Sequence, residues 1–261
     1  SSDLQRHMQQ WGTTSDQLGA IAVACRRHAA ANPKAQLRKP LTLDQYRESR
    51  WIVEPLRRDD CCLVSDGAAA VIVMSAKKAA QLGAHRAVPI LGFGQGQTSW
   101  DVALRPDLTT TAAAISAKTA FAMASLTPAD MDVAQLYDCF TICPLMTLED
   151  YGFCAKGQGG SFVQGGNIEL GGQLPLNTSG GLLSETGMPG LQLVLEGVRQ
   201  YVVQAAHMLN MQAQPAQPGA PAAAPEPEPR ITLNVRGLPL RSAIDVVVFA
   251  IACMGLNVLV G

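Results

Sequence analysis

Short apolar runs alternate with helical runs through the middle of the chain, and this alternation constrains the fold most. Residues 71–74, 88–96 and 133–140 are rich in Val, Ile and Leu, whereas residues 77–84 and 110–125 have helical character. Continuous apolar strands separated by helices are typical of an α/β layered fold. We therefore expect three strands, with residues 71–74 buried on both faces.

The N-terminal region begins with apolar residues at helical spacing. Residues 14–31 predict a surface helix, with Ser15 as its N-cap and His28 exposed among arginines. Residues 34–60 are basic and interrupted by prolines, so we expect a loop that crosses the surface. Its basic side chains could contact phosphates or form a solvated charged face; they are Lys34, Arg38, Lys39, Arg57 and Arg58.

Composition excludes some functions. The chain has 261 residues, 48% of them hydrophobic, which is enough for one core and a small appended domain. A net charge of −1 argues against nucleic-acid binding. No apolar run is long enough to span a membrane, and the first residues lack a secretory signal pattern. We therefore expect no membrane span, and a cytoplasmic location.

Seven cysteines fit neither a set of paired disulfides nor a CxxC metal motif, so we expect reduced thiols. Cys139 and Cys143 are four residues apart and could share a helix face. Two sulfurs without a second pair of ligands make a poor zinc site, so no metal is predicted. None of the four histidines has an acid or a nucleophile close in the sequence.

Glycines concentrate between residues 157 and 181 and precede a helix predicted over 190–200. Glycine lets a backbone approach another backbone or a ligand without a Cβ in the way. A proline- and alanine-rich segment, residues 211–230, then predicts an extended linker. Residues 231–261 predict a small strand-helix-strand tail, which resembles a short unit at the N-terminal end of secretins; a fused tail is the alternative.

Two stretches carry a family resemblance: YDCFTICPLMTLEDYGFCAKGQGG (137–160) and GGQLPLNTSGGLLSETGMPGLQLVLEGVRQ (171–200). They resemble the C-terminal half of thiolases, especially the branch with sterol carrier protein x and bacterial lipid-transfer proteins. RHMQQWGTTSDQLGAIAVACRRHAAA and the residues after it resemble the loop domain that covers coenzyme A, and SDGAAAVIV resembles the end of the N-terminal half. The resemblance runs from Arg6 to Gln200.

The resemblance implies an incomplete thiolase-like layered α/β fold. Residues 1–88 would be the loop domain and the end of the first half, and residues 89–210 the C-terminal domain. The first half, with the nucleophilic cysteine, is expected to be absent, and none of the seven cysteines is placed to replace it. Gly187-Met188-Pro189 stands where the family has Gly-His-Pro, and methionine cannot transfer a proton. Thiolysis by this polypeptide alone is therefore not expected.

Two candidate catalytic residues remain, Tyr137 and Asp138. Tyr137 matches the oxyanion-donor position of the family, where a phenol can donate a hydrogen bond or accept a proton. Tyrosine at this position resembles lipid-transfer proteins that act as retro-aldolases, although their second tyrosine lies near the position of Gly187 here. A packed structural tyrosine is the alternative. Asp138 could orient a neighbouring donor, but a cap for a helix beginning at Thr141 is equally consistent with the sequence.

The resemblance also implies substrate-binding residues and partners. No tightly bound cofactor is expected, and a coenzyme A thioester of a lipid or sterol would be the substrate. The partner would be a second copy or a small OB-fold protein. The expected substrate-binding residues are Asn177, Ser179, Gly180, Gly181, Met188, Arg38, Lys39 and Ser65.

Three functional hypotheses follow. The first is an acyl-CoA-handling, acyltransferase-like protein of lipid metabolism and lipid transfer. The second is a retro-aldolase that acts on a sterol or lipid side-chain CoA thioester together with a partner chain. The third is a non-catalytic CoA-binding or scaffold subunit, or a truncated gene product. Unchanged ligand affinity without turnover would distinguish the third from the others.

Overall fold

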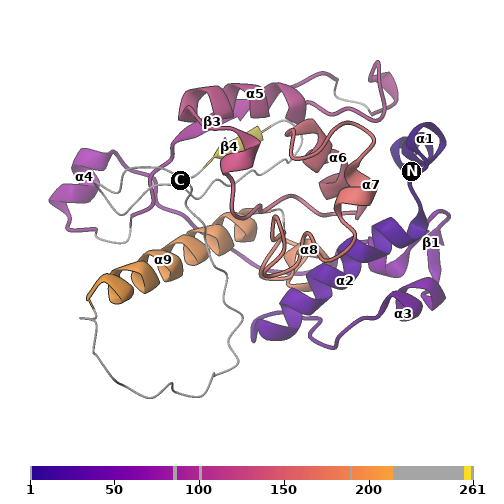
Figure 1. Ribbon diagram of the computed structural model, residues 1–261, viewed down its shortest axis with the longest axis horizontal. Coiled ribbons are helices and arrows are strands. Elements are labelled where there is room, and N and C mark those ends of the chain that lie inside the picture. The colour runs from indigo at the N-terminus through magenta and orange to yellow at the C-terminus, as the bar shows by residue number, and fades with distance from the viewer. Residues whose placement is uncertain (1, 85–86, 100–101, 189, 214–255, 260–261) are drawn as a thin grey trace.

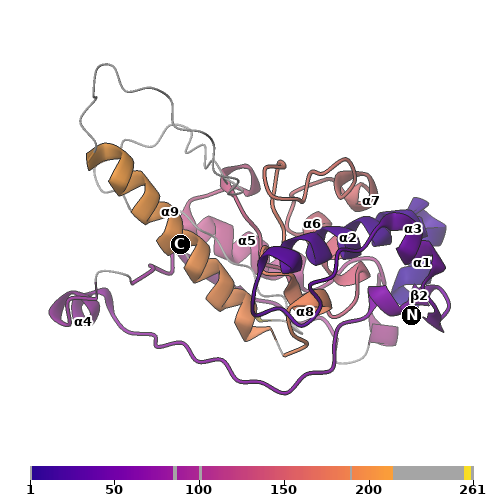
Figure 2. The ribbon, with the colours of Figure 1, turned by 90° about the horizontal axis from the view of Figure 1, so that it is seen from below.

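The computed structural model describes residues 2–84, 87–99, 102–188, 190–213 and 256–259. Figures 1 and 2 show it in two perpendicular views. Its helices are α1 (Ser2–Trp11), α2 (Ser15–Ala31), α3 (Leu43–Glu48), α4 (Ala76–Gln81), α5 (Ala113–Ala124), α6 (Ile142–Asp150), α7 (Gly159–Phe162), α8 (Gly181–Ser184) and α9 (Leu191–Ala213). Its strands are β1 (Trp51–Val53), β2 (Leu56–Arg57), β3 (Gly92–Gln95) and β4 (Leu256–Leu259).

Helix α2 is the long element of the N-terminal region. Its N-cap is Thr14, whose hydroxyl accepts the N–H of Gln17, while the Gln17 side chain accepts the N–H of Thr14. The predicted N-cap, Ser15, is instead the first helical residue. Threonine and serine both cap well, and only the reciprocal bond to Gln17 fixes which of the two does so.

The expected surface loop over residues 34–60 is partly regular. It contains α3 and an antiparallel hairpin of β1 and β2, with Trp51 paired to Arg57. The guanidinium of Arg57 stacks on the Trp51 ring at 3.8 Å and donates to the carbonyl of Ser49. Strands of only three and two residues leave little periodicity in the sequence, so the prediction of a plain loop was wrong here.

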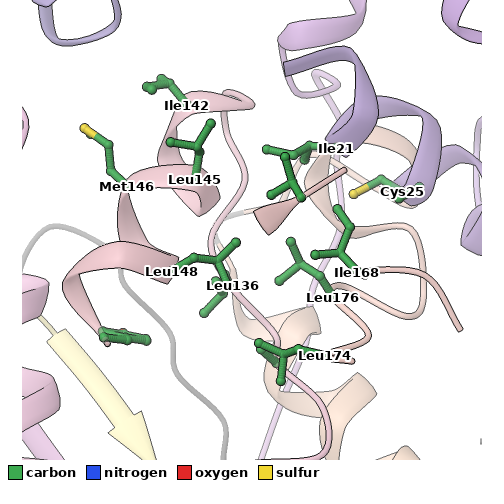
Figure 3. Close-up of a cluster of buried hydrophobic side chains, with 14 of the residues drawn as sticks. Ile21, Cys25, Leu136, Ile142, Leu145, Met146, Leu148, Ile168, Leu174 and Leu176 are labelled. Atoms are coloured by element: carbon green, nitrogen blue, oxygen red, sulfur yellow. The ribbon is translucent and has the colours of Figure 1, made fainter. Parts of the chain in front are cut away.

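The main core lies where α2, α6, the extended residues 133–136 and the turns of residues 168–176 meet (Figure 3). Buried side chains come from α2, from residues 133–136, from α6 and from residues 168–176, and they point toward one another in the close-up. Its large, fully buried members include Ile21, Leu136, Leu145, Leu148 and Leu176. The core therefore packs α2 against residues 133–176, which overlap the two stretches that carry the family resemblance.

The predicted strand over residues 133–140 forms only isolated bridges. Ala134 pairs in parallel with Leu176, and Cys61 pairs antiparallel with Phe140. The N–H of Ala134 donates to the carbonyl of Pro175, and the N–H of Asn177 donates to the carbonyl of Ala134. The segment is extended and largely buried, as predicted, but it lacks a continuous ladder.

Helix α5 confirms the helix predicted over 110–125, and its backbone lies directly on β3. A Cβ at Gly94 would lie 2.1 Å from the Ser116 carbonyl oxygen, and one at Gly92 would lie 2.2 Å from that of Ala120. Because Ser116 and Ala120 are four residues apart, they present one row of small side chains to the strand. The predicted strand over 88–96 is realised as β3, which pairs antiparallel with β4.

The predicted buried strand at residues 71–74 is wrong for this structure. Residues 63–75 run as an extended trace along one edge of the molecule toward α4 (Figure 2). Ile72 and Val73 are 86% and 72% exposed. The apolar run has no strand beside it among the described residues, and burial of a strand depends on its neighbours as well as on its own sequence.

The C-terminal part is described only in places. Helix α9 includes the helix predicted over 190–200 and continues through residues 211–213, which were expected to begin the linker. Most of the predicted linker lies outside the described residues, as do the strand at 231–235 and the helix at 240–253. The last predicted strand corresponds to β4.

Candidate functional site

The candidate site begins at the end of the extended segment that carries Tyr137. Side chains of an extended chain alternate between two faces, and here Leu136 and Asp138 are fully buried whereas Tyr137 and Cys139 are partly exposed. Tyr137 therefore lies on the opposite face from its two buried neighbours. This arrangement leaves Tyr137 partly exposed while the residues on either side anchor the backbone.

Asn177 holds this segment in place with its side chain. Its Oδ1 accepts the N–H of Leu136 at 2.7 Å, and its Nδ2 donates to the carbonyl of Leu136 at 2.8 Å. The side-chain amide thus takes the place of a neighbouring strand. Asn177 has a φ of 50°, a left-handed conformation that asparagine tolerates better than most residues. The predicted substrate-binding role of Asn177 is therefore a geometric one in this structure.

Asp138 binds the N-terminus of α8 and does not cap α6. Its carboxylate accepts the N–H of Leu182 at 2.8 Å and that of Leu183 at 3.3 Å. The thiol of Cys25 donates to the same carboxylate at 3.8 Å. Burial raises the pKa of Asp138 to about 6, although the backbone N–H groups oppose that rise.

The start of α6 has a different acidic partner. Thr141 is the N-cap of α6, and its hydroxyl donates to Asp60 at 2.7 Å. The Tyr46 hydroxyl also donates to Asp60, which is completely buried. The cap considered for Asp138 was wrong, whereas the alternative, that Asp138 orients a neighbouring backbone donor, matches its bonds to the N–H groups of Leu182 and Leu183. Asp60 bonds the N-cap Thr141 instead, and such a distant partner leaves no local signal in the sequence.

Gly180 and Gly181 let the turn before α8 fit against Asp138 and α2. They have φ values of 109° and 61°. A Cβ at Gly181 would lie 2.1 Å from Asp138 Oδ2, and one at Gly180 would lie 2.6 Å from the Ala29 Cβ. Both the conformation and the space therefore require glycine, which confirms that glycines here allow close backbone approach.

Helix α8 is the point where segments far apart in the sequence meet. The N–H of Leu37 donates to the carbonyl of Ser184, and that of Leu63 donates to the carbonyl of Leu182. The Arg26 side chain donates to the Ser184 hydroxyl at 3.0 Å. Each of the two regions that resemble the loop domain and the first half therefore contacts α8 directly.

Ser65 and Met188 lie at the loop that follows α8. The hydroxyl of Ser65 accepts the N–H of Gly187 at 3.0 Å and the Gln36 side-chain amide at 2.8 Å. Met188 packs over Gly67 so closely that a Cβ on that glycine would lie 2.1 Å from the Met188 sulfur. The structure thus brings Ser65 and Met188 onto one side of the loop around Gly187.

Ser179 is a buried support residue. Its hydroxyl donates to Glu185 at 2.6 Å, and the Asn32 side chain donates to the other oxygen of the same carboxylate at 3.2 Å. Burial is the largest influence on Glu185 and raises its pKa above the ordinary value. The sequence analysis missed Glu185 and Asn32, whose pairing is visible only after α2 has packed against the turn.

Arg38 and Lys39 are exposed in the loop that follows Leu37. Two of the other basic residues are engaged elsewhere, since Arg57 stacks on Trp51 and Arg58 pairs with Asp59 at 2.9 Å. Arg38, Lys39 and Lys34 are exposed beside Leu37, whose N–H binds α8. These three side chains remain candidates for the phosphate contact that the sequence suggested.

His28 was expected at the surface, but it is 1% exposed. Its Nδ1 lies 3.3 Å from the carbonyl oxygen of Asn177, and burial lowers the pKa of its imidazole. The signal was present in the sequence, because Leu18, Ile21, Cys25 and His28 follow the helical spacing of one buried stripe. Arg26 and Arg27, which precede His28 in the sequence, suggested a solvent-facing position instead.

Within the ranges that the structure describes, no three His, Cys, Asp or Glu side chains come together in a way that could hold a metal ion. No helix in those same ranges is both long and apolar enough to cross a membrane.

The arrangement offers one accessible phenol on a strongly anchored backbone. Tyr137 can donate a hydrogen bond to an oxyanion or exchange a proton with a hydroxyl. The buried side chains of Asp138 and Asn177 bond backbone groups around it, and Asp138 also accepts the Cys25 thiol, so both hold the local backbone. Met188 adds an apolar, proton-free side chain.

Comparison with protein families and known proteins gives a consistent result. Residues 94–220 match the family described as thiolase C-terminal domain-like. The chain is 44% identical over 202 residues to 17-hydroxy-3-oxo-4-pregnene-20-carboxyl-CoA lyase of Mycobacterium tuberculosis, covering 75% of this chain and 52% of that protein. It is 41% identical to the steroid side-chain-cleaving aldolase of Thermomonospora curvata, covering 75% of this chain and 51% of that protein.

A solved structure supports the same fold. The Ltp2-ChsH2(DUF35) aldolase is 39% identical, with a TM-score of 0.72, over 77% of this chain and 54% of that chain. The expected thiolase-like fold with partial coverage is thereby confirmed. The chain spans about half the length of the relatives that it matches.

Proposed function

The chain belongs to the thiolase superfamily, in the branch related to sterol carrier protein and lipid-transfer proteins, and on that premise we propose that it handles acyl-CoA thioesters of steroid or lipid origin. Within that class, we propose retro-aldol cleavage of a β-hydroxyacyl-CoA side chain. The observation that carries the proposal is Tyr137, a partly exposed phenol on a backbone anchored by Asn177 and Asp138.

The chemistry needs no cysteine nucleophile. The phenolate form of Tyr137 takes the proton of the β-hydroxyl group, and that oxygen becomes a ketone as the Cα–Cβ bond breaks. The electron pair moves onto the thioester as an enolate, which takes up a proton to give a shortened acyl-CoA. General base catalysis of this kind contributes about 10²–10⁴-fold to a rate.

One feature of the neighbouring loop fits this chemistry better than thiolysis, and another departs from the two-tyrosine arrangement of the retro-aldolases that the chain resembles. Met188 stands where thiolysis requires a proton-transferring side chain, and methionine cannot supply one. A second tyrosine at position 187 has no space, because a Cβ there would lie 1.7 Å from the Leu63 carbonyl oxygen. Tyr137 would therefore act without a partner phenol at that position.

The rest of the site would hold the coenzyme. Arg38 and Lys39, exposed beside the segment that binds α8, would contact its phosphates. The turn formed by Asn177, Ser179, Gly180 and Gly181 would lie against the thioester and set its geometry. Ser65 and Met188 would line the same region, with no tightly bound cofactor.

A second protein chain would bind to this one. The apolar run at residues 71–74 is largely exposed, and Ile90 and Phe93 are also exposed. Exposed apolar patches of this kind mark interaction surfaces. The Ltp2-ChsH2(DUF35) aldolase motivates a small OB-fold partner, and a second copy of this chain is the alternative. We place the protein in the cytoplasm, where its thiols would be reduced.

A turnover assay tests this function. The chain, alone and with the OB-fold partner, is incubated with a steroid β-hydroxyacyl-CoA, and the ketone and shortened acyl-CoA are quantified without added free thiol. We expect Tyr137→Phe to lower turnover by about 10²-fold or more, whereas Tyr151→Phe, the same change at the end of α6, leaves it unchanged. Equal turnover by wild type and Tyr137→Phe would refute the role of Tyr137.

Two other results have distinct meanings. Cleavage of the corresponding β-ketoacyl-CoA that requires added coenzyme A thiol, without cleavage of the β-hydroxyacyl-CoA, would indicate thiolysis in place of retro-aldol cleavage. Ligand binding without turnover in any form, with the partner present, would support a binding or scaffold subunit. Mass spectrometry of the CoA products separates these results, because each reaction leaves a different acyl group on the coenzyme.

A further inference from the structure

Two thiols meet immediately after the Tyr137–Asp138 dipeptide. The Cys139 and Cys143 sulfurs lie 3.5 Å apart, and both side chains are partly exposed. A turn brings them together, since the N–H of Cys143 donates to the carbonyl of Phe140 at 2.9 Å. A disulfide needs a sulfur separation of about 2.05 Å, so the two sulfurs are in contact and must move closer to form the bond.

Two further thiols lie beside this pair. The N–H of Cys62 donates to the carbonyl of Cys139 at 2.9 Å, and Cys61 forms a β-bridge with Phe140. The hydrogen bond from Cys143 and burial together raise the pKa of Cys139 well above its ordinary value. The resting form of the pair is therefore a hydrogen-bonded dithiol, consistent with the reduced cysteines that the sequence predicts.

Neither a zinc site nor isolated thiols account for the arrangement. In the part of the chain that the structure describes, no third side chain joins the two sulfurs to make a metal site. Cys25 is completely buried and donates to Asp138, which removes it from exchange with small molecules. Cys139 and Cys143 combine sulfur contact with partial exposure, and access to small molecules is one of the conditions for disulfide exchange.

We propose that Cys139 and Cys143 form a reversible dithiol–disulfide site that reacts with small-molecule disulfides such as oxidised glutathione. The thiolate of one cysteine attacks the small disulfide, and one glutathione leaves as its thiolate. The other cysteine then attacks the mixed disulfide, a second glutathione leaves, and the intramolecular bond forms. The protein loses two hydrogen atoms, and one oxidised glutathione becomes two reduced molecules.

The bond would lie next to the candidate catalytic residue. Cys139 follows Asp138 directly, and Cys143 is in the first turn of α6. A covalent link between them would tie the end of the extended segment to that helix. This inference rests on the sulfur geometry alone and does not depend on the reaction proposed for Tyr137.

The test uses the folded wild-type chain treated with oxidised glutathione. We expect an intact mass lower by about 2 Da, restored by dithiothreitol. Chymotrypsin cleavage after Phe140 separates the two cysteines, so the disulfide would hold the two peptides together until reduction. A disulfide from Cys139 to Cys61 or Cys62 would overturn the assignment, as would two unmodified thiols under conditions that oxidise the urea-unfolded chain.

Variants make the test more specific. Cys143→Ser removes the second thiol, so Cys139 should retain one glutathione and gain roughly 305 Da. Cys154→Ser, the matched control on a partly buried cysteine outside the pair, should still lose about 2 Da. Loss of the 2 Da change in Cys154→Ser, with its retention in Cys143→Ser, would contradict the proposal. The wild-type peptide map decides the question even if a variant fails to fold.

Discussion

The side-chain amide of Asn177 binds both backbone groups of Leu136, at 2.7 Å through Oδ1 and at 2.8 Å through Nδ2. All four atoms are inaccessible to solvent because both residues are fully buried. One residue therefore fixes the backbone that precedes Tyr137. This contact, together with the bridges at Ala134 and Phe140, fixes the segment that carries the phenol.

Replacement of Asn177 by alanine should be costly. It removes two hydrogen bonds and leaves a buried N–H and a buried carbonyl of Leu136 without partners, so we expect a loss of about 2–4 kcal/mol in the free energy of unfolding. Urea titration measures it. Asn167→Ala removes a single, partly buried bond to Phe162 and should cost only about 0.5–1.5 kcal/mol. Equal losses for the two variants would contradict this role of Asn177.

Gly181 should be intolerant of any side chain. In Gly181→Ala the new Cβ would meet the Asp138 carboxylate, in addition to the backbone strain of a φ of 61°. We expect a loss of about 2–5 kcal/mol by chemical denaturation. Gly165→Ala is the matched control, because its φ is 68° and its Cβ would have open space. It should lose only about 1–2 kcal/mol; a similar loss at both sites would show that the clash with Asp138 is unimportant.

Asp138 should make stability depend on pH in a specific direction. Its folded pKa of about 6 lies above the ordinary value of 3.8, so the native state binds the proton more tightly than the unfolded state does. Protonation therefore favours folding, and stability from this group increases as the pH falls from 7 toward 4.

The variant Asp138→Asn cannot take up this proton and isolates the effect. Between pH 7 and pH 4.5 the unfolding free energy of wild type, relative to this variant, should rise by about 2 kcal/mol. Urea titrations of both proteins at the two pH values measure it. A difference that stays constant, or falls toward pH 4.5, would mean that Asp138 is not a buried acid with a raised pKa.

Ile72 tests whether the run at residues 71–74 is an exposed interaction surface. Its side chain is 86% exposed, so Ile72→Asp should change the unfolding free energy of the chain by less than about 0.5 kcal/mol. The same change should weaken association with a partner or a second copy, which sedimentation velocity detects. Strong destabilisation of the isolated chain would instead show that Ile72 is buried.

The sequence predicted the elements whose signals are local. Helices α2 and α5 have enough apolar positions to be recognised, and the short helix α4 overlaps residues 77–84, which were expected to be helical. The glycine-rich turn before α8 was also identified correctly as a place of close approach. Each of these depends on residues within a few positions of one another.

The features that the sequence did not predict depend on distant partners. Asp138 was assigned to the nearest helix start, but Asp60 occupies that place and Asp138 binds α8. The strand predicted at residues 71–74 is exposed, because its burial requires neighbours that its own sequence does not specify. Tyr137 was identified from the family resemblance, whereas its anchoring by Asn177 became visible only in three dimensions.

A thermal melt with and without a steroid acyl-CoA tests the central claim, a folded site for CoA thioesters around Tyr137. At a ligand concentration of 100 Kd, linkage adds about 2.7 kcal/mol, so the Tm should rise by about 5–10 °C. Tyr137→Phe should keep this shift, because it removes proton transfer and leaves the binding surface in place. A cooperative melt whose Tm is unchanged by the thioester would contradict the account.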